Sequence, residues 1–184
     1  MEWSDSELLK LARCSLEIAF KNGEELPYGL PAQQETVNGV FVTLERCGRL
    51  RGCKGCVEGK YPLQDTIWRI ARNSAFEDPR FDPLIEEELE GLELSISILG
   101  QMERVDVEHP SEYRQRLHLG IDGISLKLGE LGALFLPEVA KEHNWDIETT
   151  LSHLCQKAGL EEEDWRNSEA EVFRFQTRHL PASP

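Results

Sequence analysis

Alternation of apolar and polar residues predicts strands along much of the chain, most clearly at residues 92–99. The sequence there, Leu-Glu-Leu-Ser-Ile-Ser-Ile-Leu, is typical of a strand with one buried face. Residues 39–45 are a β-branched and aromatic run of strand type, and residues 171–177 alternate as a last strand. Two short apolar stretches at residues 124–128 and 133–136, separated by a glycine-containing turn, predict a hairpin.

Helical spacing of apolar residues predicts several helices. Residues 5–21 carry an apolar face and follow Ser4, which fits a capping box with Glu7. Another helix starts near Leu63, directly after a proline, and a later one covers residues 147–158 and ends at a glycine. Because the strands arrive mostly as hairpins rather than in alternation with helices, the sequence predicts an α+β fold, with a mostly antiparallel sheet packed with helices.

Length and composition indicate a folded globule. The chain has 184 residues, of which 40% are hydrophobic and 29% are charged, and this suffices for a core. No apolar run approaches the roughly 18 residues that a membrane span needs, and the acidic, polar N-terminus does not resemble a signal peptide. Five cysteines, an odd number without disulfide-scaffold spacing, indicate a reduced cytoplasmic protein.

One short stretch concentrates glycine, cysteine and cationic residues: Leu-Arg-Gly-Cys-Lys-Gly-Cys at residues 50–56. It follows the strand at residues 39–45 after a short connection, so we expect a β-hairpin whose second strand ends at this motif. Gly52 and Gly55 flank Cys53 where a side chain would keep another backbone or a ligand away. Such a strand end would present the thiol at an accessible bend. The alternative is that Cys53 is a buried structural thiol.

Cations gather around this motif, although the chain as a whole has a net charge of −14. Residues 46–72 hold seven cations against two carboxylates. Cations near a thiol favour the thiolate, and a cation-rich segment of an acidic protein suits an anionic ligand. The alternative is that these cations lie on solvated faces and pair with the surplus carboxylates. The acidic balance argues against broad nucleic-acid binding, because contacts to phosphates need cations.

Three chemistries compete for the pair of Cys53 and Cys56. A redox pair normally stands at the start of a helix, whose dipole activates the first thiol, and the residues after Cys56 do not open a helix. A zinc site needs four ligands, usually as two pairs, and the sequence has one such pair. The favoured hypothesis is therefore a single nucleophilic or ligand-contacting thiol, Cys53, without a metal or a cofactor.

Several motifs of the chain together resemble the AMMECR family. They are Leu50-Arg51-Gly52-Cys53-x-Gly55 with Pro62-Leu63, Asp78-Pro79-Arg80-Phe81, Leu92-Glu93-Leu94-Ser95-Ile96-Ser97, Gly120-Ile121-Asp122-Gly123, Leu136-Pro137-Glu138-Val139 and Lys157-Ala158-Gly159-Leu160. The match runs in order over residues 5–178, so we expect a single domain of this family there and a loose C-terminal tail at residues 179–184. Lys54, where an apolar Ile usually stands, and Cys56 depart from the family pattern.

The resemblance implies a two-lobed α+β domain, with the Arg-Gly-Cys motif at a cleft. Family members of this kind resemble protein A of the AmmeMemoRadiSam system, which implies a Memo-like protein and a radical SAM protein as partners. The resemblance implies no established reaction, because the biochemical activity of the family is itself unsettled.

Two functions follow from these observations, and RNA binding through the cations of residues 46–72 is a third, weaker alternative. In the first, the domain is an enzyme, or a component of one, that uses Cys53 as a nucleophile or ligand-contacting thiol and Arg51 to hold a small anionic group with its forked donors. Backbone N–H groups at Gly52 and Gly55 would add donors, and Arg80 either forms a local pair or reaches toward the motif. In the second, the domain is a non-catalytic protein-binding or adaptor domain, because the sequence shows no self-sufficient catalytic set.

Overall fold

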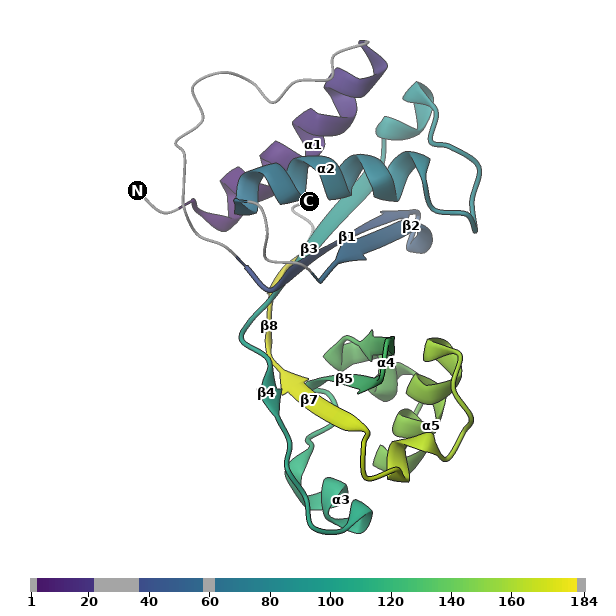
Figure 1. Ribbon diagram of the computed structural model, residues 1–184. Helices are drawn as coiled ribbons and strands as arrows, with labels where there is room; N and C mark the ends of the chain where they lie inside the picture. Colours follow the sequence, from purple (N-terminus) through teal and green to yellow (C-terminus); the bar gives the residue numbers. More distant parts are fainter. Residues whose placement is uncertain (1–2, 22–36, 58–61, 182–184) are drawn as a thin grey trace. The chain divides into compact units, whose positions relative to one another are not determined.

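The computed structural model describes residues 3–21, 37–57 and 62–181 (Figure 1). The chain forms two compact units: unit 1 comprises residues 1–99 with 178–184, and unit 2 comprises residues 100–177. Each unit has a four-stranded sheet and helices of its own, so the prediction of an α+β fold is confirmed. Within the described residues, no helix is both long enough and apolar enough to cross a membrane.

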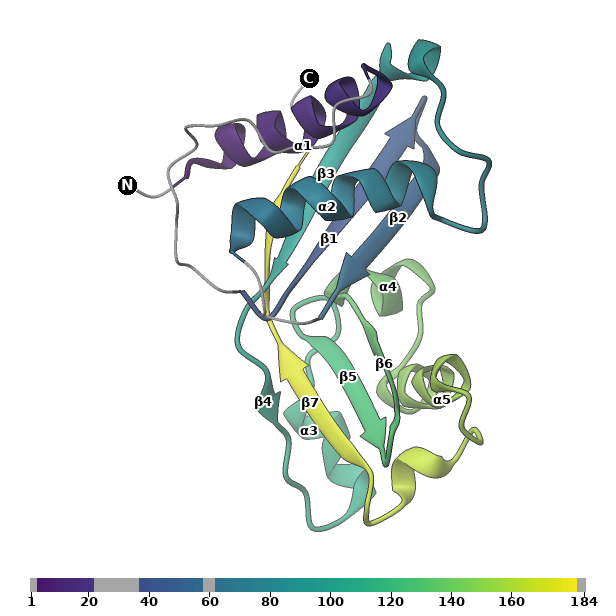
Figure 2. The same ribbon diagram turned by 45° about the horizontal axis from the view of Figure 1, so that its top comes forward.

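Unit 1 combines one sheet with two long helices in its described part. Its elements are α1 (Asp5–Phe20), β1 (Gly39–Arg46), β2 (Arg49–Cys56), α2 (Leu63–Phe76), the 3-10 helix η1 (Glu86–Leu89), β3 (Leu92–Leu99) and β8 (Thr177–Leu180). The strand order is β2-β1-β3-β8, and β1 runs antiparallel to β2 and to β3. Figures 1 and 2 show α1 and α2 on the same face of this sheet. Because β2 stands at the end of the strand order, it is an edge strand of this sheet.

The core of unit 1 lies between these helices and one face of the sheet. The predicted capping box starts α1, since the Ser4 hydroxyl accepts a hydrogen bond from Glu7 N–H and the Glu7 carboxylate accepts one from Ser4 N–H. In β1, the side chains of Val40, Val42 and Leu44 are fully buried in the core that α1 and α2 share. Because side chains alternate across a strand, the residues between them point to the other face of the sheet.

Unit 2 is built around the second sheet. Its elements are β4 (Glu103–Arg104), η2 (Pro110–Glu112), α3 (Tyr113–Arg116), β5 (Gly123–Leu128), β6 (Leu131–Phe135), α4 (Pro137–Glu142), α5 (Ile147–Ala158), η3 (Asp164–Arg166) and β7 (Glu171–Phe175). The strands pair antiparallel in the order β4-β7-β5-β6. Leu126, Leu151 and Trp165 are buried in its core. Asp146 caps the start of α5, and Gly159 ends the helix in the left-handed conformation.

The structure differs from two sequence predictions for the C-terminal segment at their boundaries. The strand predicted at residues 171–177 ends early, as β7, and Gln176 separates it from β8, which belongs to the other sheet. The tail predicted at residues 179–184 is not loose at its start, because His179 lies in β8 and Leu180 is fully buried. Alternation shows that residues are extended, but it does not show that the chain leaves one sheet and enters another.

Candidate functional site

The predicted hairpin is present, and β2 ends at Cys56, the last residue of the motif, so Arg51, Gly52 and Cys53 lie inside the strand. β2 pairs with β1 from the turn to Cys56. The hairpin turns at Cys47 and Gly48, whose φ values are 52° and 69°, and two positive φ values are typical of a two-residue hairpin turn. The prediction that Cys53 stands at a bend is therefore wrong, and its thiol projects from an edge strand instead.

Both glycines of the motif make room for close packing. A Cβ atom at Gly52 would lie 2.1 Å from the carbonyl oxygen of Ser74, so α2 packs directly against the backbone of β2. A Cβ atom at Gly55 would lie 2.3 Å from the ring of Phe41. The Ser74 hydroxyl also accepts a hydrogen bond of 3.0 Å from the N–H of Lys54. The two glycines thus fix the position of the strand between α2 and an aromatic ring.

Cys53 faces away from the helices. Because the missing side chain of Gly52 would point to α2, alternation directs Cys53 to the opposite face of the sheet. The half-buried Cys53 Sγ atom lies 3.3 Å from Thr43 Oγ1, on the neighbouring strand β1. We call this face of the unit 1 sheet the polar face, and its residues in the following argument are Thr43, Cys53, Ser95, Ser97 and His179.

Hydroxyl groups continue across the polar face from Cys53. Thr43 stands opposite Ser95 on β3, and the Oγ atom of Ser97, two residues further along β3, lies 3.2 Å from His179 Nδ1 on β8. Sequence reasoning named Ser95 and Ser97 only within a family motif and assigned no role to any of these four residues. The serines at alternate positions of the strand at residues 92–99 were a usable signal for a polar face. No local pattern in the sequence predicts that His179 lies in this sheet.

Two side chains hold the backbone of Cys53. Its N–H donates to Asp78 Oδ2 over 2.9 Å, and its carbonyl oxygen accepts from Arg80 Nη2 over 3.3 Å. Arg80 Nη2 also donates to Asp78 Oδ2 over 2.7 Å. Arg80 therefore forms the local pair and also reaches the motif, which were the two alternatives from the sequence. Since β2 is an edge strand, this pair takes the place of a neighbouring strand at Cys53.

The Asp78–Arg80 pair is buried at one end and exposed at the other. The side chain of Asp78 is 3% exposed, whereas that of Arg80 is 55% exposed. Hydrogen bonding from the Arg80 guanidinium outweighs burial and holds the pKa of Asp78 well below its usual range, with a further contribution from the N–H of Cys53. The pair thus presents a cation to solvent next to Cys53.

Arg51 is already paired with a carboxylate of the chain. Its Nε and Nη2 atoms donate to the two carboxylate oxygens of Glu88, each over 2.8 Å, and the two side chains are 17% and 16% exposed. This hydrogen bonding lowers the pKa of Glu88 and raises that of Arg51. The Phe81 ring centre lies 6.0 Å from the guanidinium of Arg51 and 5.5 Å from that of Arg80. A role of Arg51 toward a ligand stays a prediction.

The second thiol of the motif lies elsewhere. Residues three apart on a strand point to opposite faces, and Cys56 packs beside the core of the helical face, with Arg69 Nη2 at 3.9 Å from its Sγ atom. The structure therefore does not bring Cys53 and Cys56 together, and both thiols are free. In the described part of the chain, no group of three or more His, Cys, Asp or Glu side chains could hold a metal ion.

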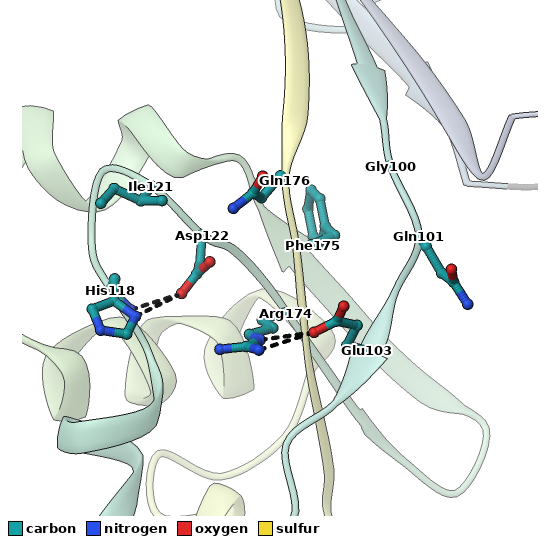
Figure 3. Close-up of a pocket in the computed structure, with 9 residues that line it drawn as sticks. All are labelled: Gly100, Gln101, Glu103, His118, Ile121, Asp122, Arg174, Phe175 and Gln176. Carbon is teal, nitrogen blue, oxygen red and sulfur yellow. Dashed lines mark hydrogen bonds and ion pairs between the residues drawn. The ribbon is translucent and has the colours of Figure 1, made fainter.

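Unit 2 contains a separate pocket of about 590 Å³. Its lining, drawn in Figure 3, comes from the segment around β4, the turn before β5 and the end of β7: Gly100, Gln101, Glu103, His118, Ile121, Asp122, Arg174, Phe175 and Gln176. Sequence reasoning used the Gly-Ile-Asp-Gly motif at residues 120–123 for the family resemblance and assigned it no ligand, whereas two of its side chains line this pocket.

Comparison with known proteins decides the family. The family model described as AMMECR1 matches residues 9–180. The chain belongs to the AMMECR1 family. A protein of Methanothermobacter thermautotrophicus is 39% identical over 173 residues, which are 93% of this chain and 90% of that protein. Protein NEQ441 of Nanoarchaeum equitans is 35% identical over 171 residues, 92% of this chain and 95% of that protein.

A solved structure of the AMMECR1 family supports the fold. The crystal structure of uncharacterized protein PH0010 from Pyrococcus horikoshii matches with a TM-score of 0.85 and 35% identity, over 94% of this chain and 88% of that chain. The match confirms the α+β fold and the resemblance seen in the sequence. The names of these AMMECR1 relatives state no activity.

Proposed function

We propose that this AMMECR1 domain acts as an enzyme, or as one component of an enzyme system, in which Cys53 contacts a small anionic ligand at the polar face. Cys53 is the ligand-contacting thiol and the candidate nucleophile. Arg80 supplies the positive charge beside it, and Thr43 supplies a hydroxyl 3.3 Å from the thiol. Gly52 and Gly55 keep the strand close to its neighbours, and Arg51 orders the segment that carries Glu88.

The fixed backbone of Cys53 is the observation that carries this proposal. A residue on an edge strand normally leaves its outward N–H and C=O groups to solvent. Here Asp78 and Arg80 bond both groups of one residue, so the direction of a single thiol is set. The Nη1 atom of Arg80 makes no hydrogen bond within the described part of the chain, and this exposed donor suits a carboxylate or phosphate group.

Paired alkylating reagents test the anionic ligand. Iodoacetate and iodoacetamide react with thiols in the same way, but only iodoacetate is an anion. We expect the ratio of the iodoacetate rate to the iodoacetamide rate to be about fivefold higher at Cys53 than at Cys47, because one cation near the reacting group contributes about 1 kcal/mol in water. Mass spectrometry resolves the rate at each cysteine. Cys47, exposed in the turn of the same hairpin, is the internal control.

The variant Arg80→Gln separates charge from geometry, since glutamine keeps a donor but loses the cation. The rate ratio at Cys53 should fall to that of Cys47 or below it, because the carboxylate of Asp78 then lacks its cation. The ratio at Cys47 should not change. Equal ratios at both cysteines in the wild-type protein would contradict an anionic ligand at Cys53.

The alternative is a protein-binding or adaptor role, with Memo-like and radical SAM proteins as partners. Large exposed apolar side chains flank the motif and its neighbouring loop: Leu50 (41%), Val57 (43%) and Ile85 (55%). Exposed apolar groups of this kind occur at protein-binding surfaces. An unreactive Cys53 without any preference for anions would favour this alternative over the first function.

A further inference from the structure

The pocket of unit 2 contains a buried carboxylate that one histidine partly satisfies. The residue Asp122 is 6% exposed. Its Oδ2 atom accepts a hydrogen bond of 2.9 Å from the backbone N–H of His118 and lies 3.3 Å from His118 Nδ1. Its Oδ1 atom accepts no hydrogen bond within the described part of the chain. Figure 3 shows the His118 ring and the Asp122 carboxylate turned toward one another in the pocket wall.

The local backbone is shaped to place this carboxylate. The N–H of Asp122 donates to the carbonyl oxygen of His118 over 2.8 Å, and Gly120 has a φ of 81°, which closes a tight turn. A Cβ atom at Gly123 would lie 2.4 Å from the ring of Phe175, so this glycine lets the turn approach β7. Closing the turn uses one carboxylate oxygen, and the second oxygen and the imidazole remain for another partner.

The guanidinium group of the pocket does not neutralise this charge. Arg174 is held by Glu103 through hydrogen bonds of 3.1 Å and 3.0 Å from its Nε and Nη2 atoms, because the two residues stand opposite each other on β7 and β4. Figure 3 shows this pair within the same lining. In the described part of the chain, Asp122 therefore has no hydrogen bond or ion pair with an arginine or lysine, and the imidazole of His118 is its one side-chain partner.

We propose that this pocket binds a small molecule through a protonated amine, with Asp122 as the counter-ion. The ammonium group donates to Asp122 Oδ1, and the amides of Gln101 and Gln176 bond polar groups on the rest of the molecule. The side chains of Ile121 and Phe175 supply the apolar part of the lining. In the tautomer that carries its hydrogen on Nδ1, His118 would donate to Asp122 and present Nε2 as an acceptor. This site lies in unit 2 and does not depend on the role of Cys53.

Titration with simple probes tests the proposal. We expect ethanolamine and putrescine, which carry ammonium groups, to shift the NMR signals of His118 and residues 121–123 saturably, whereas acetate and inorganic phosphate leave them in place. Asp122→Asn keeps an oxygen for the turn but removes the charge. It should weaken amine binding about tenfold or more, because the ammonium group loses its charge-assisted hydrogen bond.

Asp106→Asn is the matched control. Asp106 lies in unit 2, is absent from the pocket lining, has an 83% exposed side chain and pairs with Arg104, so its loss should leave amine binding unchanged. The comparison of ammonium with anionic probes uses the wild-type protein, so it holds even if Asp122→Asn does not fold. Saturable binding of acetate or phosphate at His118, or no response to either amine, would overturn the proposal.

Discussion

Gly52→Ala is expected to lower the free energy of unfolding by about 3 kcal/mol or more. The added Cβ atom would lie 2.1 Å from the carbonyl oxygen of Ser74, and a helix backbone cannot rotate away as a side chain can. Either α2 or β2 has to move, which disrupts well-packed side chains of the core. Urea titration followed by fluorescence measures the change, because Trp68 is buried on α2.

Gly48→Ala is the control for this variant. Gly48 has a φ of 69°, and no atom lies within 4 Å of an added Cβ. Its replacement should therefore lower the free energy of unfolding by only about 1–2 kcal/mol, through the left-handed backbone conformation that alanine disfavours. If Gly52→Ala were no more destabilising than Gly48→Ala, the close packing of α2 on the motif would be contradicted.

Asp78→Asn is expected to destabilise the protein at neutral pH by about 2–3 kcal/mol, since it removes charge-assisted hydrogen bonds from Arg80 and from Cys53. The pKa of Asp78 is lower in the folded state than its unfolded value of about 3.9. Its ionised form therefore stabilises the fold fully above pH ~4, and this stabilisation is lost as the pH falls toward the folded-state pKa.

The pH dependence separates this mechanism from a general packing defect. The unfolding free energies of the wild-type protein and of Asp78→Asn should converge as the pH falls below about 4, because protonation removes in the wild type what the variant lacks. Denaturant titrations between neutral and acidic pH give both curves. Parallel curves would show that the charge of Asp78 does not stabilise the backbone of Cys53.

Much of unit 1 could be predicted from local sequence. The capping box at Ser4, the alternation at residues 92–99 and the helix after Pro62 rest on contacts within a few residues, and all three are present in the structure. The prediction of a bend at Cys53 was wrong because the two glycines beside it lie inside a continuous strand. What requires Gly52 is the backbone of α2, which is distant in sequence.

The candidate site was only partly predictable for the same reason. Cys53, Arg51 and Arg80 could be named from one crowded motif and one turn. The contact from Asp78 to Cys53 N–H joins residues 25 apart, and the pair of Ser97 and His179 joins residues 82 apart. Such pairings depend on strand order, which alternation does not encode. A role for the carboxylate of Asp122 was likewise not predictable, because only the structure shows that its turn lines a pocket.

Alkylation of the native protein by iodoacetamide, resolved for each of the five cysteines, tests the central claim that Cys53 is an oriented, reactive thiol. Cys53 should react in the native protein at a rate comparable to that of the more exposed Cys47, because its thiol projects from the outer face of an edge strand whose backbone Asp78 and Arg80 hold. Cys155, fully buried and with a thiol pKa raised by burial, should stay unmodified until the protein unfolds. If Cys53 is protected in the folded protein as Cys155 is, its role is structural and the account is contradicted.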